Sequence, residues 1–170
     1  MSEYVFREAT AADDSAIGEL LVAAFVEQYA RKLPDVEVTE QRKADLRAVA
    51  AKRAVAKVWV VEHAGEVVGT VAMWAPGAKG SEAWLPRAAD LRHLAVAQAH
   101  RGGLVSRLLL DGAEAWARAQ GCEAVCLHVR RGALGVARVY QRRGYVRTPE
   151  GDLDKLPEVF LEAFVLRLVP

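Results

Sequence analysis

The spacing of apolar residues along the chain changes between strand-like alternation and helical periodicity, and each pattern predicts an element. Residues 4–10, "YVFREAT", alternate and predict a short first strand. Two β-rich runs, Val58–Glu62 and Val67–Trp74, flank a short turn at Ala64-Gly65 and predict an antiparallel hairpin. The following Gly- and Pro-rich segment, 76–86, predicts a loop.

Two helices are predicted between the first strand and the hairpin. Residues 15–33 carry apolar side chains at helical spacing, preceded by capping side chains within 10–14. Pro34 ends this helix region. Thr39 is placed to cap a second helix that runs to about Arg53.

The second half of the chain alternates strands and helices. In order, we expect a strand at 89–96, a helix at 104–120 that Gly121 stops, a strand at 123–129, a helix at 133–144, a strand beginning at 145–147, a polar loop at 148–157 and a strand at 158–169. Hairpin strands pair antiparallel, and strand-helix-strand crossovers give parallel pairs. The fold class is therefore mixed α/β, with helices covering a mixed sheet.

Composition and charge narrow the functional classes. The chain has 170 residues, 52% hydrophobic and 26% charged, which is typical of a single globular domain spanning 1–170. A formal net charge of +1 gives no electrostatic reason to expect nucleic acid or an anionic membrane as partner. We expect no membrane helix, no signal peptide and, from Cys122 and Cys126, no disulfide framework. These features predict a cytoplasmic protein.

Arg101, Gly102 and Gly103 stand where a predicted strand hands over to a predicted helix. Backbone N–H groups in a first helical turn lack partners within the helix, and the helix dipole places partial positive charge there. Glycines let that backbone approach a phosphate, and arginine offers a fork of donors that suits phosphate oxygens. The junction therefore indicates a site for a phosphorylated cofactor. The alternative is a tight turn with a solvated arginine, because short glycine patterns often arise by chance.

Two motifs in sequence give this chain a family resemblance. "LAVAQAHRGGLVS", residues 94–106, resembles the acyl-CoA-binding core of the GNAT superfamily of N-acyltransferases, whose members usually carry Arg/Gln-x-x-Gly-x-Gly/Ala at the start of this helix. "VYQRRGY", Val139 to Tyr145, stands where the family has a helix tyrosine followed by Gly-Tyr or Gly-Phe. The resemblance covers essentially the whole chain and is strongest from Leu91 to Tyr145. It implies a GNAT-like fold, with a central mixed sheet of about seven strands flanked by about four helices.

The resemblance also implies a reaction. The chain is expected to transfer an acetyl group from acetyl-CoA, its cosubstrate, to a primary amine of a small molecule or peptide by direct attack. No metal, nucleic acid or membrane is implied, and a homodimer is compatible because members of the family often pair. Leu104 stands where the family prefers glycine, and Ala133 stands where relatives often carry asparagine. These departures motivate an alternative, a CoA-binding module without catalysis.

The residues implied to bind the cofactor lie at the strand end and in the loop after it. Backbone groups of the strand end would serve the pantetheine arm, and the loop and first helical turn would hold the pyrophosphate. They are Leu94, Ala95, Val96, Arg101, Gly102, Gly103, Leu104, Val105 and Ser106. Ser106 replaces a small family residue and adds a hydroxyl donor. We expect binding to survive if the Leu104 side chain turns into the core, and to weaken if it does not.

Tyr140 matches the family's helix tyrosine, whose hydroxyl protonates the departing sulfur. It shares a predicted helix face with Ala133, Val136 and Ala137. The pattern alone favours a core tyrosine with an outward hydroxyl, and the resemblance reverses that preference.

The general base is less clearly marked. His93 is the first candidate, because imidazole titrates near neutrality. Strand alternation places it with Leu91 and Ala95 unless a bulge changes its facing, and a structural histidine is the alternative. Glu62, Glu27 and a water relay are weaker candidates.

Four aromatic residues are candidates for the acceptor pocket: Phe25, Tyr29, Trp74 and Trp84. Aromatic walls suit an apolar amine, but each residue can equally anchor the core or a loop. Cys122, Cys126 and His128 are interpreted as structural residues, because a structural zinc needs four ligands and no second pair is evident.

Overall fold

The computed structural model describes residues 3–32 and 38–168, which form two compact units. Unit 1 comprises Met1–Met73 and His93–Ala115, and unit 2 comprises Trp74–Arg92 and Trp116–Pro170. The boundaries fall within one strand and one helix, β4 (Ala88–Val96) and α4 (Leu104–Ala119). Each of these elements therefore contributes one end to each unit.

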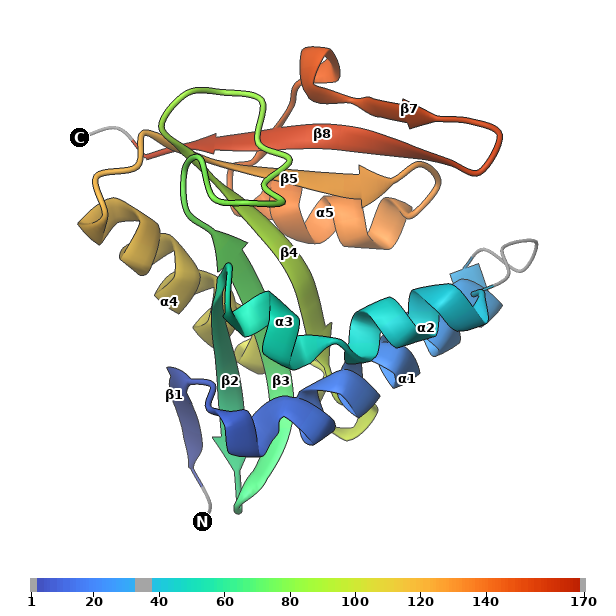
Figure 1. The fold of residues 1–170 in the computed structure, drawn as a ribbon, viewed down its shortest axis with the longest axis vertical. Coiled ribbons are helices and arrows are strands. Elements are labelled where there is room, and N and C mark those ends of the chain that lie inside the picture. The colour runs from blue at the N-terminus through green and yellow to red at the C-terminus, as the bar shows by residue number, and fades with distance from the viewer. Residues whose placement is uncertain (1–2, 33–37, 169–170) are drawn as a thin grey trace. The chain divides into compact units, whose positions relative to one another are not determined.

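Unit 1 is built on strands that hydrogen-bond in the order β1-β2-β3-β4 and lie side by side in Figure 1. Besides β4 they are β1 (Tyr4–Glu8), β2 (Lys57–His63) and β3 (Glu66–Trp74). The β1–β2 and β2–β3 pairs are antiparallel, as the predicted hairpin requires. Ala64 and Gly65 both have positive φ, 51° and 82°, which is the backbone of a two-residue hairpin turn.

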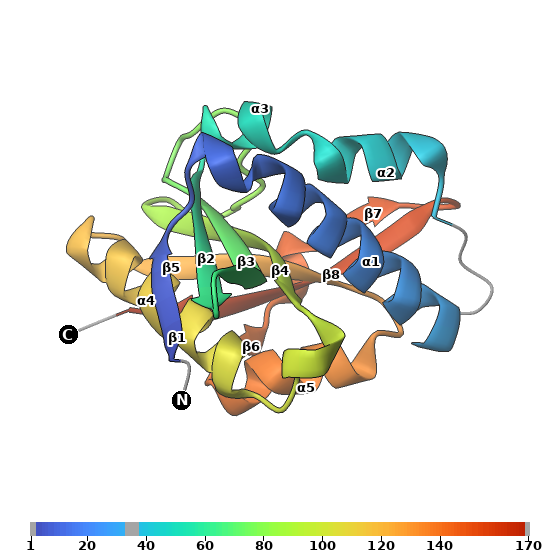
Figure 2. The same ribbon diagram turned by 90° about the horizontal axis from the view of Figure 1, so that it is seen from below.

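Helices cover both faces of these strands, with α1 on one face and α4 on the other (Figure 2). The remaining bounds are α1 (Asp14–Lys32), α2 (Glu40–Arg47) and α3 (Val49–Arg53). Pro34, the predicted end of the first helix region, lies outside the described residues. None of the helices within 3–32 and 38–168 has the length and apolar character that crossing a membrane requires.

The prediction of one helix from Thr39 to Arg53 is correct at its start and wrong in its middle. Thr39 Oγ1 accepts the Arg42 N–H at 3.1 Å, as a helix cap does. The helix then breaks at Ala48, whose ψ of 55° is not helical. Leu46 and Val49, on either side of the break, are both fully buried. Packing of these two side chains outweighs the helix propensity of alanine, which sequence alone could not show.

Unit 2 contains the parallel pair of the sheet. Ala88–Asp90 of β4 pair parallel with Ala124–Cys126 of β5 (Ala124–Arg130), across the crossover that the sequence predicts. The strand order continues β4-β5-β8-β6, with β7 also paired to β8, and every pair with β8 is antiparallel. The other elements are α5 (Leu134–Arg142), β6 (Val146–Arg147), β7 (Leu153–Lys155) and β8 (Val159–Arg167). In Figure 1, α5 lies beside β5 and β8.

The mixed sheet is confirmed, and residues 3–32 and 38–168 form eight strands and five α-helices where about seven and about four were expected. The additional strand, β7, lies inside the predicted loop 148–157, and Asp154 and Lys155 in it are exposed. Its three residues are too few to show a strand period in the sequence. The additional helix arises from the break at Ala48.

Candidate active site

The junction between β4 and α4 adopts a backbone that only glycine accepts readily. A short 3-10 turn, Gln98–His100, follows β4, and α4 begins at Leu104. Between them, Gly102 and Gly103 have φ of 136° and 101°. A Cβ built on either glycine meets no atom within 4 Å. Conformation and not lack of space therefore explains the paired glycines.

The first turn of α4 presents backbone donors at a rigidly held position. The Gly103 carbonyl accepts two hydrogen bonds from this turn, from the Arg107 N–H at 3.0 Å and from Ser106 Oγ at 3.1 Å. The backbone N–H groups of Leu104 to Ser106 come before this position and have no acceptors within the helix. No acidic residue lies in this turn, so the positive end of the helix dipole is not offset locally. The geometry suits an anion.

Close packing against β3 fixes the position of this helix end. A Cβ at Gly69 of β3 would lie 2.6 Å from Val105 Cγ1 and 3.0 Å from Leu109 Cδ1. Both α4 side chains are fully buried, so Val105 can offer only its backbone to a ligand. The Ala97 N–H donates to the Val68 carbonyl at 2.8 Å, which ties the start of the loop to the same strand.

Leu104 does not turn into the core. It is 45% exposed at the first position of α4. This is the condition under which we expect weaker cofactor binding, because the leucine side chain stays near the approach to the loop.

Arg101 is exposed but has two partners in unit 1. Its Nη2 lies 3.5 Å from Glu27 Oε2 of α1, and its Nε donates to the Val96 carbonyl at 3.4 Å. Glu27 is thus engaged with the loop arginine. The other weak base candidate, Glu62, accepts from Arg7 Nε at 2.8 Å. Both carboxylates thus lie beside an arginine, although Glu27 Oε2 is buried without a hydrogen bond from the described residues.

His93 interrupts the regular alternation of β4. Its φ of 60° is left-handed, a conformation rare for a residue with a Cβ. Leu91 and Ala95 are buried on either side of it, whereas Arg92, His93 and Leu94 are each half-buried. Alternation alone therefore does not describe the facing of His93, as expected for a local irregularity in the strand.

A buried lysine that the sequence analysis missed contacts this histidine. Lys52 Nζ of α3 lies 3.0 Å from His93 Nδ1, and the lysine residue is only 9% exposed. The Phe25 ring meets the imidazole edge to face, with centroids 6.4 Å apart, and the Arg42 guanidinium lies 5.6 Å from the Phe25 ring centroid. Burial, with a smaller contribution from Arg42, lowers the pKa of Lys52 to about 8. Helical spacing in the sequence could have indicated the burial of Lys52, because it follows the buried Val49 by three residues and so lies on the same helix face.

Tyr140 lies in unit 2, near the end of α5. It is 6% exposed, and its ring meets the Tyr145 ring at a centroid distance of 5.5 Å and an angle of 68°. Of the residues predicted to share its helix face, Val136 and Ala137 are half-buried, and Ala133 is buried but precedes the helix as its N-cap. Ala133 donates its N–H to the Arg130 carbonyl at 3.0 Å. The tyrosine ring is therefore held by packing.

The predicted aromatic residues have different surroundings. Phe25 lies against His93 in unit 1, and the side chain of Tyr29 lies outside the part of the chain whose side chains are described. In unit 2, Trp74 is buried with the Arg92 guanidinium 4.3 Å from its ring centroid. Trp84 packs on the buried cluster that contains Cys126, with its ring 5.2 Å from that of His128. Trp84 thus packs within unit 2, and its part in an acceptor pocket stays a prediction.

The cysteines and His128 are accounted for by local packing. Cys122 and Cys126 are buried free thiols, and burial raises the pKa of both. His128 Nε2 lies 2.8 Å from the Gly151 carbonyl oxygen. Within the described ranges, 3–32 and 38–168, no three His, Cys, Asp or Glu side chains converge as metal ligands do.

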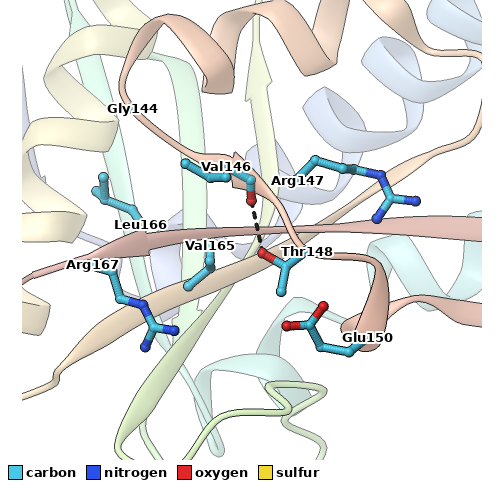
Figure 3. A pocket seen from close by; sticks show the side chains of 8 residues that line it. All are labelled: Gly144, Val146, Arg147, Thr148, Glu150, Val165, Leu166 and Arg167. Atoms are coloured by element: carbon cyan, nitrogen blue, oxygen red, sulfur yellow. Dashed lines mark hydrogen bonds between the residues drawn. The ribbon is translucent and has the colours of Figure 1, made fainter.

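A shallow pocket on unit 2 involves none of the predicted site residues (Figure 3). It is lined by Gly144, Val146, Arg147, Thr148, Glu150, Val165, Leu166 and Arg167. Thr148 Oγ1 donates to the Val146 carbonyl at 3.0 Å, and Arg147 is held by Asp152 at 2.6 Å. Two of its polar side chains, Arg147 and Thr148, are thus bonded within the protein.

Comparison with known proteins identifies the family. The model of the acetyltransferase (GNAT) family matches residues 15–145, and no curated protein sequence matches the chain. A GNAT-family acetyltransferase from Staphylococcus aureus Mu50 superposes with a TM-score of 0.77 at 13% identity, covering 98% of this chain and 100% of that one.

Two structures determined with ligands have the same fold. PaiA N-acetyltransferase from Thermoplasma acidophilum, in complex with coenzyme A, has a TM-score of 0.71 at 13% identity and covers 95% of this chain and 98% of its own. A GNAT-family acetyltransferase from Brucella melitensis, in complex with acetyl-CoA, has a TM-score of 0.64 at 20% identity and covers 99% and 90%. By the family match and the fold, this chain belongs to the GNAT family of acetyltransferases.

Proposed function

We propose that this protein transfers the acetyl group of acetyl-CoA to a primary amine of a small molecule or peptide. The observation that carries the proposal is the start of α4, where two left-handed glycines and an exposed arginine open a rigidly packed helix. Such a helix end suits a pyrophosphate. The Thermoplasma and Brucella proteins, which share the fold, were crystallised with coenzyme A and acetyl-CoA.

The proposed cofactor contacts follow from this arrangement. The N–H groups from Gly102 to Ser106 and the Arg101 guanidinium would receive the pyrophosphate oxygens. Backbone groups of Leu94, Ala95 and Val96 would serve the pantetheine arm. Ser106 Oγ is directed to the Gly103 carbonyl, so its proposed part is to shape the turn.

Acetyl transfer requires two proton movements. The amine nitrogen attacks the thioester carbonyl, the new C–N bond forms, and the C–S bond breaks. The nitrogen loses a proton, and the departing thiolate gains one. Tyr140 is the proposed acid for the sulfur, supported by its place in "VYQRRGY" and by the packing of its ring against Tyr145. His93 is the proposed base.

A second candidate function is a CoA-binding module without catalysis. The exposed Leu104 favours it, because its side chain stands where a smaller residue would leave room for phosphate. The two functions differ in turnover, not in binding.

Calorimetric titration with acetyl-CoA tests the proposal first. We expect saturable binding, and an absence of heat at millimolar acetyl-CoA would contradict both candidates. A thiol-release assay with a broad panel of primary amines then separates them. Amine-dependent release of CoA supports the transferase, whereas binding without release by any amine supports the module.

A further inference from the structure

Lys52 and His93 form a part-buried contact, and the protonation of each side chain affects the other. The ammonium form of lysine carries three donors and no acceptor. At 3.0 Å from Nζ, His93 Nδ1 must then accept, so the imidazole proton resides on Nε2. When Nζ is a neutral amine it can accept from Nδ1–H, and Nε2 then carries the lone pair. The charge of Lys52 therefore decides which form His93 adopts.

The acidic side chains that the structure describes on α1 and β4 do not pair with Lys52. The acidic side chains described on α1 pair elsewhere: Asp14 with Arg53, Glu19 with Arg47 and Glu27 with Arg101. On β4, Asp90 is held by Arg92, through Nε at 2.8 Å.

On α2, the charge that lowers the pKa of Lys52 is a second cation, Arg42. A buried ammonium beside another cation is disfavoured relative to the neutral amine. Both protonation states of Lys52 are therefore accessible near neutral pH.

The backbone and the aromatic packing hold the imidazole in this contact. His93 has a left-handed φ of 60°, and the Phe25 ring of α1 meets the imidazole edge to face. A strained conformation persists only where surrounding structure fixes it, and such positions gather at functional sites. The side chain of His93 is thus fixed relative to α3.

We propose that Lys52 and His93 act together as a proton relay for the acceptor amine, a proposal that rests on the proposed acetyl transfer. In the reactive form, Lys52 is a neutral amine that accepts the Nδ1–H of His93. As the acceptor nitrogen forms its bond to the acetyl carbon, its proton passes to His93 Nε2, and the Nδ1 proton passes to Lys52 Nζ. The pair ends as an ammonium and a neutral Nε2–H imidazole. Lys52 is a positioning residue in this scheme, because it acts only through His93.

The relay predicts an unusual order of severity for two substitutions. Lys52→Arg keeps a permanent cation that holds His93 in the Nε2–H form, so we expect kcat to fall by roughly 100-fold at every pH. Lys52→Met removes the cation and leaves His93 without its lysine partner. It should retain turnover, with its acid limb moved below that of the wild type, which in the relay follows the Lys52 pKa of about 8. If Lys52 has only a structural role, the order is reversed: Lys52→Met is then the more damaging substitution, because arginine preserves the charge. His93→Asn should remove the limb.

Nitrogen NMR of His93 provides a readout that does not depend on turnover. We expect protonated Nε2 and an accepting Nδ1 at pH 6.5 in the wild type, with the Nδ1–H form growing as Lys52 deprotonates. Protonated Nδ1 at pH 6.5, or a Lys52→Met acid limb unchanged from wild type, overturns the relay. If the tautomers behave as expected but no amine supports turnover, acetyl transfer is refuted and the coupling of the two side chains stands. Should Lys52→Arg fail to fold, the methionine variant and the NMR measurement still decide.

Discussion

The paired glycines before α4 provide the cleanest perturbation of the proposed cofactor loop. Gly103 has a φ of 101°, and a Cβ on it meets no atom within 4 Å. Gly103→Ala therefore adds no clash and acts only through the backbone. Left-handed backbone costs a residue with a Cβ about 1–2 kcal/mol. If acetyl-CoA requires the present backbone, this cost weakens its binding by roughly 5- to 30-fold, since about 1.4 kcal/mol is tenfold.

A matched control separates loop geometry from general destabilisation. Gly65 in the β2–β3 turn has a φ of 82° and equally open space around a Cβ. Gly65→Ala should lower the melting temperature comparably, by about 2–8 °C for 1–2 kcal/mol in a chain of this size, yet leave acetyl-CoA affinity unchanged. Calorimetry at one pH and salt concentration measures both affinities. The reasoning is refuted if Gly103→Ala binds acetyl-CoA as tightly as wild type, or if Gly65→Ala weakens binding equally.

Three further predictions concern other parts of the structure. Leu104→Gly should tighten acetyl-CoA binding, as measured by calorimetry. Leu134→Gly is the control, because it changes an exposed leucine at the same position of α5, and it should leave binding unchanged. Unchanged or weaker binding by Leu104→Gly means that the side chain does not limit phosphate approach. Gly69→Ala should destabilise the protein by about 1–3 kcal/mol in urea unfolding, because its Cβ would lie 2.6 Å from Val105 Cγ1, and a smaller loss would show that α4 can shift. The pKa of Asp13 is lowered to about 2, chiefly by hydrogen bonds from Arg7, so its carboxylate stabilises the fold above its unfolded pKa and loses that effect as pH falls from about 4 to about 2. Asp13→Asn should therefore be destabilised at pH 6 and approach wild type near pH 2.5, and a gap that stays constant with pH would contradict the assignment.

The sequence predicts those parts of the fold whose cause is local. The turn at Ala64-Gly65 and the stop at Gly121, with a φ of 78°, need residues that tolerate positive φ, and the sequence places them there. The crossover rule likewise predicts the parallel pairing of β4 with β5. The break at Ala48 depends on packing between elements, and the residues at that point contain no glycine or proline that would predict it.

The candidate site shows the same division. Arg101, Gly102 and Gly103 could be recognised because consecutive residues create the turn and its donors. The contact between Lys52 and His93 joins residues 41 positions apart, and one of them adopts a backbone that strand alternation does not predict. The sequence likewise does not predict that Leu104 is exposed, because the rotation of α4 is set by the packing of Val105 against Gly69. Local chemistry marks the loop, whereas tertiary packing determines which side chains meet.

Amine-dependent release of CoA thiol by Tyr140→Phe, beside wild type and Tyr145→Phe, tests the central claim most directly. The two tyrosines are both buried and pack against each other, so the variants remove one hydroxyl each from the same environment. We predict amine-dependent turnover in wild type, a loss of roughly 100-fold or more in kcat for Tyr140→Phe at unchanged acetyl-CoA affinity, and nearly full activity for Tyr145→Phe. Turnover by Tyr140→Phe at the wild-type rate, or wild-type protein that binds acetyl-CoA but releases no thiol with any amine, would contradict the account.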